Sequence, residues 1–314
     1  MKKKVVLFGG GTGMSTLLKG LKEFPIDITT IVSVCDDGQS TGKLREEFNI
    51  PAVGDIRKVI VSLSETEPLI EELLNYRFHT TSDLDGHAVG NLLLTALSNI
   101  TGNMSDGIES LSKVLNLKGK VLPLTEDNVT LIGKMEDGSI VKGEHHITQT
   151  PKRVIDVFYE TEPEIPRIVI EKIQEADLII FSMGSLFTSI LPNLLSEEIL
   201  RTIDKSHAKL MYVCNMMTQP GETDKFKTSD HIKTINRYLG HRKLDTVVLN
   251  TGEIDSSLVK KYETLEQKDL VELDLEEVKK LVPEIITNQY AMVTDNVIRH
   301  NIMKLSADIF SSII

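Results

Sequence analysis

The sequence of 314 residues contains no tryptophan and only two cysteines, Cys35 and Cys214. Two cysteines without a CxxC spacing cannot form a disulfide scaffold, which fits a cytoplasmic protein. Both follow apolar runs, so we expect two buried, unreactive thiols near strand ends. The adjacent pair His145 and His146 lacks the spacing of a zinc-binding motif, so no zinc site is predicted.

Long hydrophobic runs and an excess of positive charge are also missing. The apolar run behind the basic N-terminus is only four residues long, and no run reaches 18 residues, so neither a signal peptide nor a membrane helix is predicted. Lys and Arg number 35 against 46 Asp and Glu, which gives a net charge of −11. This acidic balance argues against nucleic acid or a membrane surface as the main ligand.

The chain does contain short β-branched runs that alternate with helical stretches. Five of these runs are continuously apolar, as in strands of a parallel sheet that is covered on both faces. They lie at residues 4–8, 28–34, 176–181, 208–213 and 245–250. The alternation predicts an α/β fold with a Rossmann-like, doubly wound and mainly parallel sheet.

The middle of the chain departs from this alternation. The pattern is helical over 55–116 and changes to short strands over 119–157, with Asp137-Gly138 predicting a hairpin with a type I′ turn. No linker rich in Pro, Gly or Ser interrupts the chain. We therefore expect one α/β nucleotide-binding domain over 1–314, with a helical and β-hairpin insertion at roughly 65–160.

A glycine-rich turn separates the first predicted strand from a predicted helix at about 13–23. Its bare backbone is typical of a phosphate cradle, so Gly10, Gly11, Thr12 and Gly13 are candidate binding residues, although a purely structural tight turn would have the same sequence. The spacing does not match the dinucleotide fingerprint, because Met14 occupies the third glycine position. NAD(P) is therefore a less favoured ligand.

Acidic residues follow the next two predicted turns. Asp36 and Asp37 come directly after the second strand, where they could bind a ribose or hold Mg²⁺ with a substrate phosphate. The segment 38–43 that follows predicts either an anion-binding flap or an ordinary surface loop. Gly54 and Asp55 are candidate binding residues because they form a third turn of this kind, although a plain turn at Gly54 with Asp55 as the cap of the helix behind it explains the sequence as well.

Two further stretches carry candidate binding or catalytic groups. His87 and Asn91 are four residues apart, so we expect them to share a helix face, either as the wall of a site or in plain helix packing. Gly184 and Ser185 follow another buried strand and precede a predicted helix, so we expect them to bind phosphate as the first turn does. A Gly-x-Ser-x-Gly motif is absent there, so serine hydrolase chemistry is not predicted.

Polar groups near the C-terminal half complete the candidates. Asn215 follows a strand, where its amide suits recognition of a base or a sugar. Arg299 is expected at the start of the C-terminal helix, as a phosphate clamp. The apolar segment 305–314 packs either on the body of the protein or on a second subunit in a homo-oligomer.

Six motifs in this order resemble the gluconeogenesis factor family of bacteria, which is related in fold to 2-phospho-L-lactate transferase. The resemblance spans about residues 4–301 and rests on "GGGTGMSTLLKGL", "DDGQSTGKLR", "GDIRKV", "LDGHAVGNLLL", "GSLFTSILPNLL" and "CNMMTQPGETD". It implies a Rossmann-like protein that binds a UDP-sugar. It also implies a regulatory role in carbon flux to cell-wall precursors and in cell shape during gluconeogenic growth, with no firm reaction.

The resemblance also implies roles for individual residues. The glycine turn belongs to the nucleotide site of the related transferase, and Asp36 and Asp37 match in position the acids that hold its Mg²⁺. Tyr262 and Arg299 match positions that the family associates with its nucleotide-sugar ligand.

Two hypotheses follow. The first is a cytoplasmic regulator that binds a nucleotide sugar such as UDP-N-acetylglucosamine and acts through a partner protein, because no obvious nucleophile is paired with a base. The alternative is a Mg²⁺-dependent transferase of the 2-phospho-L-lactate transferase type, with a nucleotide-activated donor. In that case Asp36 and Asp37 hold the metal and His87 is the candidate base.

Overall fold

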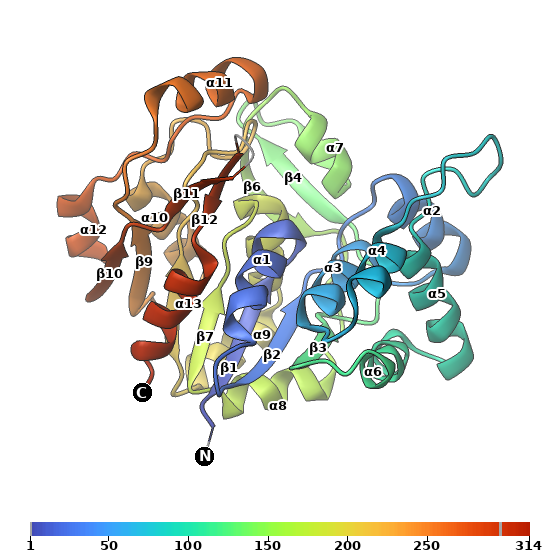
Figure 1. The fold of residues 1–314 in the computed structure, drawn as a ribbon. Helices are drawn as coiled ribbons and strands as arrows, with labels where there is room; N and C mark the ends of the chain where they lie inside the picture. Colours follow the sequence, from blue (N-terminus) through green and yellow to red (C-terminus); the bar gives the residue numbers. More distant parts are fainter. Residues whose placement is uncertain (1, 295–296) are drawn as a thin grey trace.

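The computed structural model describes residues 2–294 and 297–314, and its centre is a parallel sheet of seven strands (Figure 1). In spatial order these strands are β10 (Glu284–Asn288), β9 (Thr246–Asn250), β8 (Lys209–Val213), β7 (Leu178–Phe181), β1 (Lys4–Gly9), β2 (Asp27–Val32) and β3 (Lys120–Pro123). Every neighbouring pair is parallel. The predicted doubly wound α/β fold is confirmed.

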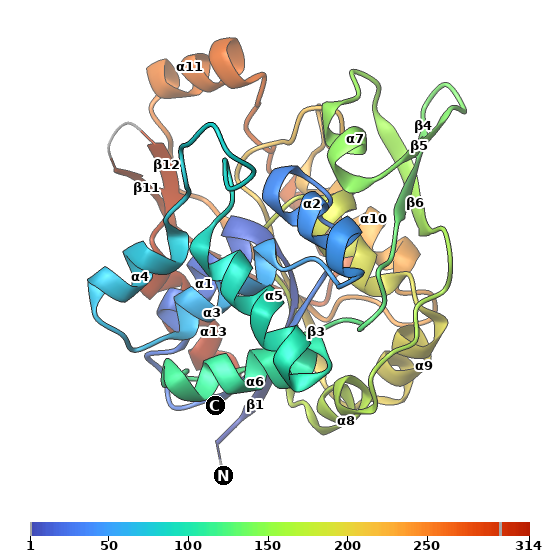
Figure 2. The same cartoon turned by 90° about the vertical axis from the view of Figure 1, so that its right-hand side faces the viewer.

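Helices cover both faces of this sheet. Helix α1 packs between α3 and α13 on one face, and α8, α9 and α10 lie on the other (Figures 1 and 2). The α-helices are α1 (Gly11–Leu21), α2 (Gln39–Phe48), α3 (Gly54–Leu63), α4 (Pro68–Asn75), α5 (Val89–Thr101), α6 (Met104–Val114), α7 (Glu144–Gln149), α8 (Arg167–Glu175), α9 (Glu197–Lys205), α10 (Thr228–Tyr238), α11 (Ser256–Glu266), α12 (Leu275–Leu281) and α13 (Ile302–Ser311). A π-helical turn, η1 (Leu186–Ile190), and a 3₁₀ turn, η2 (Leu191–Leu194), follow β7.

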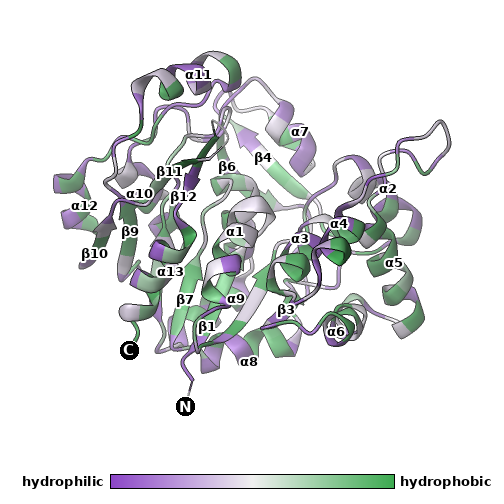
Figure 3. Cartoon of the chain, viewed as in Figure 1, coloured by the Kyte–Doolittle hydropathy of each residue, from purple (hydrophilic) through white to green (hydrophobic). Residues whose placement is uncertain are grey.

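The central strands form because their side chains are apolar on both faces. Residues 5–8 of β1 are all buried, and the rings of Phe8 and Phe181 stack with centroids 5.9 Å apart. Figure 3 shows the same layering, with hydrophobic central strands such as β7 and hydrophilic stretches on outer helices such as α12. Burial on both faces is why the sequence of these strands shows no alternation.

The segment at roughly 65–160 contains the predicted helices and hairpin, and it also contributes a strand to the main sheet. Its strand β3 pairs with β2 and forms an edge of the main sheet, which the sequence did not reveal. Only the later part forms a separate antiparallel sheet, with β4 (Leu131–Met135) between β5 (Ile140–Lys142) and β6 (Val154–Tyr159). This small sheet and α7 lie beyond the carboxyl edge of the main sheet (Figure 1).

The predicted hairpin joins β4 and β5, but the predicted turn type is wrong. A type I′ turn needs positive φ at both central residues, and here only Gly138 has it, with φ of 83°. The Gly138 N–H donates to Met135 O, and the Met135 N–H donates to Ser139 O. One left-handed glycine therefore closes a slightly longer loop.

The C-terminal region also differs from the prediction. Residues Val297–His300 form strand β12, which pairs with β11 (Ala291–Thr294), so Arg299 does not begin the last helix. Helix α13 starts at Ile302 and buries Leu305 and Ile309 in the core. Its packing on α1 favours the body of the protein as the partner of this apolar segment.

The two thiols are buried, as predicted. Burial raises the pKa of Cys35 to about 11 and the pKa of Cys214 to about 12, so both remain protonated at neutral pH. Across residues 2–294 and 297–314, the structure contains no helix with the length and apolar character needed to cross a membrane.

Candidate functional site

The first glycine turn lies where the order of strands reverses. From β1 the chain proceeds to β2 and β3 on one side, whereas β7, β8, β9 and β10 follow one another on the other side. The loops that leave β1 and β7 therefore diverge at the carboxyl edge of the sheet. Ligands of open α/β sheets bind in the crevice at such a reversal point.

The turn itself leaves the start of α1 open. Gly10 is the N-cap and has no side chain to offer, and the first turn of α1 contains no acidic residue. Gly11 has φ of 66°, a left-handed conformation that favours glycine. The first N–H groups of α1 have no partner within a helix, which is the arrangement that binds phosphate elsewhere.

The turn after β7 packs directly against the first turn. A methyl group at Gly13 would lie only 2.0 Å from the carbonyl oxygen of Met183, and one at Gly9 only 2.3 Å from Ser182 Oγ. Glycine is therefore required at these positions for close approach. The two predicted turns form one continuous surface.

A cavity of about 580 Å³ opens on this surface. Eight sequence-predicted residues line it: Gly10, Gly11, Thr12, Gly13, Gly184, Ser185, Asn215 and Tyr262. The other residues that line it are Met183, Ser189, Met216, Met217, Thr218, Gln219, Glu266, Lys268, Val297, Ile298 and His300. The structure thus brings together the two glycine turns, the end of β8, helix α11 and strand β12.

Asn215 and Tyr262 fix the walls of this cavity. The Asn215 side chain accepts from Gly184 N at 2.9 Å and donates to Gly184 O at 2.6 Å, so it holds the second turn in place. The Tyr262 hydroxyl accepts a hydrogen bond from Ile298 N at 3.1 Å and joins α11 to β12. Both residues therefore have structural bonds in addition to a place on the cavity wall.

The acidic residues lie on the other side of the glycine turn. Asp55 is not the N-cap of α3; Val53 is, and the Asp55 carboxylate instead lies against Gly10 and pairs with Lys58 at 2.9 Å. Burial raises the pKa of Asp36, and the nearby charge of Asp55 raises it further. Glu144 reaches the same group, and burial, with Asp36 and Asp55, raises its pKa to about 8.

Asp37 turns away from Asp36 and toward the small sheet. Its Oδ1 accepts a hydrogen bond from the backbone N–H of His145 at 2.8 Å, in the first turn of α7. The segment after it is neither flap nor loop, because Gln39 begins helix α2. Buried Arg45 in α2 donates to the carbonyls of Cys35 and Asp36, both at 2.9 Å, and thereby fixes the backbone that carries the two acids.

His87 and Asn91 belong to a buried polar network and do not line the cavity. His87 precedes helix α5, so the shared helix face that we predicted is wrong, although both side chains reach Ser40. Ser40 Oγ lies 3.0 Å from His87 Nδ1 and 3.2 Å from Asn91 Nδ2. Arg57 donates to Asn91 Oδ1 at 3.0 Å, so this network connects α2, α3 and α5.

Arg299 is exposed and does not line the cavity, whereas the neighbouring His300 does. Successive side chains of a strand point to opposite sides, so the Arg299 side chain points away from that of His300. Burial lowers the pKa of His300 to about 4, so its ring is neutral near pH 7. The residue that lines the cavity is thus the neighbour of the predicted one.

Glu222 is a functional candidate that the sequence motifs contained but did not single out. It is fully buried and accepts hydrogen bonds from Phe187 N at 2.9 Å, from Thr188 Oγ1 at 3.1 Å and from the Ser185 hydroxyl. Burial raises its pKa, and these hydrogen bonds oppose that shift. Its place behind a Pro-Gly turn, just after a strand end, was the only available sequence signal.

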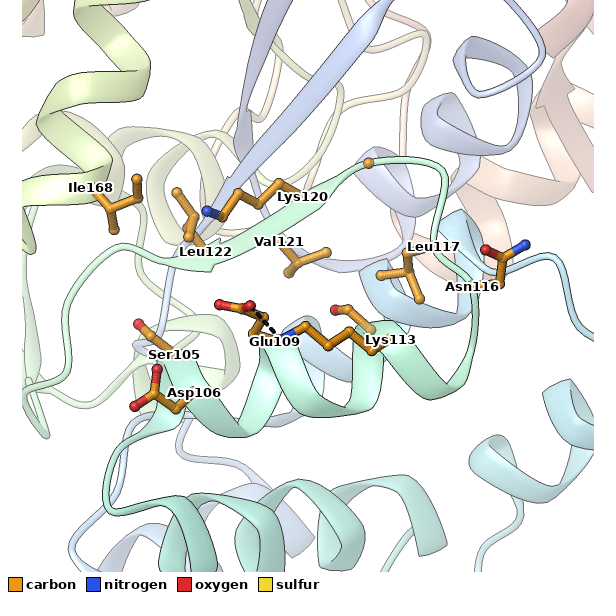
Figure 4. A pocket seen from close by; sticks show the side chains of 12 residues that line it. Ser105, Asp106, Glu109, Lys113, Asn116, Leu117, Lys120, Val121, Leu122 and Ile168 are labelled. Atoms are coloured by element: carbon orange, nitrogen blue, oxygen red, sulfur yellow. Dashed lines mark ion pairs between the residues drawn. The ribbon is translucent and has the colours of Figure 1, made fainter.

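A second hollow, of about 680 Å³, lies between α6 and β3 (Figure 4). Glu109 and Lys113 on its wall pair with each other at 2.7 Å. None of the residues predicted to bind a ligand lines it. Its position at the start of β3 places it away from the carboxyl edge, so we assign the candidate site to the cavity at the glycine turns.

Comparison with known proteins agrees with this geometry. The family model described as 2-phospho-L-lactate transferase CofD matches residues 5–291. The chain is 46% identical over 307 residues to the gluconeogenesis factor of Bacillus subtilis, covering 98% of this chain and 96% of that protein. It is 43% identical over 300 residues to the gluconeogenesis factor of Listeria innocua, covering 95% and 92% of the two chains. The chain belongs to the gluconeogenesis factor family.

A solved structure shows the same fold for this family. A crystal structure of a UPF0052-family protein from Bacillus halodurans superposes with a TM-score of 0.93 at 44% sequence identity, covering 98% of this chain and 99% of that one. The resemblance to the gluconeogenesis factor family that the six motifs indicated is thereby confirmed. The two glycine turns are part of a fold shared with that protein.

Proposed function

We propose that the cavity at the glycine turns binds a nucleotide diphosphate sugar such as UDP-N-acetylglucosamine. The observation that carries this proposal is the open start of α1, which lines the cavity at the point where the strand order reverses. Uncapped N–H groups and the positive end of a helix dipole bind phosphate oxygens without any lysine or arginine. An acidic protein can therefore hold an acidic ligand there.

The size and lining of the cavity also suit such a ligand. Its volume of about 580 Å³ falls in the range typical of small-molecule pockets. Met183, Met216 and Met217 supply apolar surface, which suits the face of a nucleobase, and Thr218 and Gln219 supply polar groups beside it. NAD(P) is less favoured because the fingerprint spacing is absent.

We further propose that the protein is a cytoplasmic regulator rather than a catalyst. The Ser185 hydroxyl on the cavity wall is hydrogen-bonded to buried Glu222, and we assign this pair to holding the second turn rather than to catalysis, because Glu222 is also bonded to the backbone of that turn at Phe187 N. The name of the relatives, gluconeogenesis factor, supports a role in gluconeogenic carbon metabolism. We propose that this role is the control of carbon partitioning toward cell-wall precursors and of cell shape. Such control needs a partner protein that distinguishes the ligand-bound form.

A thermal-shift comparison tests the proposed ligand class. UDP-N-acetylglucosamine should raise the melting temperature more than GDP or NAD⁺ at equal concentration, because only a state that binds ligand is stabilised. Long incubation with Mg²⁺ should return the nucleotide sugar unchanged. A preference for NAD⁺ would refute the proposed ligand class. Release of UDP would refute the proposal that the protein is a regulator rather than a catalyst.

The alternative remains a Mg²⁺-dependent transferase, and a specific observation favours it. The Asp55 carboxylate lies against Gly10, its charge raises the pKa of Asp36 and of Glu144, and a divalent cation would relieve this repulsion between carboxylates. When bound, such a cation would neutralise charge on a transferred phosphoryl group. Because Asp37 turns toward α7, Asp36 and Asp55 are the better pair for a metal. Among the described residues, no group of three or more His, Cys, Asp or Glu side chains has the geometry of a metal site.

Calorimetry separates the alternative from the regulator. If a metal is part of the site, nucleotide-sugar affinity should fall when Mg²⁺ is replaced by a chelator, and Asp36→Asn should remove that difference. Equal affinity in Mg²⁺ and in chelator would contradict the transferase hypothesis.

A further inference from the structure

We propose that the two glycine turns bind different parts of the ligand, with Ser185 accepting a hydrogen bond from a sugar hydroxyl rather than donating one to phosphate. This inference rests on the proposed function, because it assigns the orientation of a nucleotide sugar in the same cavity. It also departs from the sequence prediction, in which both turns bind phosphate.

The backbone donor of the second turn is already in use. Gly184 N donates to Asn215 Oδ1 at 2.9 Å, and the Asn215 amide returns a hydrogen bond to Gly184 O. A phosphate oxygen at this position would have to displace a side chain that is bonded to both backbone groups of Gly184. The first turn has no such cap.

The hydroxyl of the second turn is used as well. Ser185 has one proton, and it is donated to Glu222 Oε1. Thr188 Oγ1 lies 3.1 Å from the same carboxylate oxygen and 2.6 Å from Ser185 Oγ, so its proton also stays within this group. What Ser185 presents to the cavity is therefore a lone pair, which accepts hydrogen bonds.

The charge behind the turn acts in the same direction. Glu222 is buried, and its three described partners are the uncharged donors Ser185, Phe187 and Thr188. An ionised carboxylate in this position repels a phosphate and attracts the hydrogen of a hydroxyl group. Asp55 beside the first turn is paired with Lys58 at 2.9 Å, whereas the described partners of Glu222 carry no positive charge. The diphosphate is thus directed to the start of α1, and a hydroxyl of the sugar to Ser185.

Substitution of Ser185 tests this division directly. Calorimetric titration of Ser185→Ala should show a loss of affinity for UDP-N-acetylglucosamine of about three- to tenfold, as expected for one uncharged hydrogen bond. Its affinity for UDP, which lacks the N-acetylglucosamine on the β-phosphate, should be unchanged. Ser112→Ala, which removes a hydroxyl bonded within α6, is the matched control and should alter neither affinity.

Glu222→Gln provides a second test, because it reverses the direction of the hydrogen bond between residue 222 and Ser185. Phe187 N requires an oxygen at its position, so the new amide must direct its N–H groups toward Ser185 and Thr188. Ser185 then accepts from the amide, and its own proton becomes available to the cavity. The preference for UDP-N-acetylglucosamine over UDP should narrow in this variant.

The outcomes separate the two proposals. If the wild type binds neither nucleotide, the proposed function fails, and this inference fails with it. If both bind and Ser185→Ala weakens both equally, the proposed function stands, but Ser185 contacts phosphate and this inference is wrong. If Ser185→Ala fails to fold, Glu222→Gln decides. A preference for UDP-N-acetylglucosamine over UDP as large as in the wild type would overturn this inference and leave the proposed function standing.

Discussion

At the scale of single residues, the contact between Gly13 and Met183 sets the spacing of the two turns. We expect Gly13→Ala to lower the free energy of unfolding by about 1–3 kcal/mol, the usual cost of overpacking, because its methyl group would lie 2.0 Å from a backbone oxygen. Urea unfolding measures this change. Thr16→Ala on the same helix is the control and should change stability by less than about 0.5 kcal/mol. Equal stabilities for Gly13→Ala and the wild type would show that the turns are not in contact.

The raised pKa of Glu144 predicts how the stability of the protein depends on pH. Its pKa is raised to about 8 in the folded state, whereas an ordinary glutamate ionises near 4.5. Between these values the folded state binds more protons than the unfolded state, so stability falls as pH rises, by up to about 1.4 kcal/mol per pH unit. In chelator, the melting temperature should fall from pH 6.5 to 8, and Glu144→Gln should flatten that decline. A variant with the wild-type slope would contradict the burial of this carboxyl group.

The sequence predicted those site residues whose role depends on the backbone. It did not predict the roles that depend on which partner a side chain meets in the folded protein. The glycines of both turns were predicted because strand–glycine–helix sequences have few other uses. The directions of Asp37 and Asp55 were not, since a carboxylate within reach of several groups takes the partner that the tertiary fold supplies. Glu222 escaped for the same reason: its donors lie more than thirty residues away.

At the scale of elements, the short helix α7 depends on a cap from outside its own sheet. It has only six residues, and Asp37 Oδ1 accepts the hydrogen bond of His145 N. Asp37→Ala should therefore speed amide hydrogen exchange in α7, through the loss of about 0.5–2 kcal/mol of capping energy, and leave β1 and β7 protected. Asp255→Ala, which uncaps α11, should act on α11 alone. Unchanged exchange in α7 would show that this cap is not formed.

Elements that are apolar on both faces were predictable, and polar or short ones were not. The buried strands β1, β7, β8 and β9 have continuous apolar runs. The edge strand β3 has only four residues, and in β10 only Ile285 and Ile286 are apolar, so their sequences lack this signal. Strand β12 was mistaken for a helix start because four residues are too few to show a period.

At the scale of the whole molecule, the order of the strands places the site. Reversal of that order at β1 brings residues from the first turn, from the end of β8 and from α11 to one cavity, although Gly10 and Tyr262 are far apart in sequence. Sequence patterns predicted the sheet and its parallel strands, but not which loops would meet. His87 was separated from the cavity by this topology, and Tyr262 was brought to it.

The central claim, that a nucleotide sugar binds at the start of α1, is tested most directly by hydrogen exchange with and without UDP-N-acetylglucosamine. We predict ligand-dependent protection in peptides that contain Gly10–Gly13 and Met216–Gln219, because both segments line the cavity. The hollow between α6 and β3 should show no change. Protection confined to residues 105–122, or no protection at the glycine turn under saturating ligand, would contradict the account.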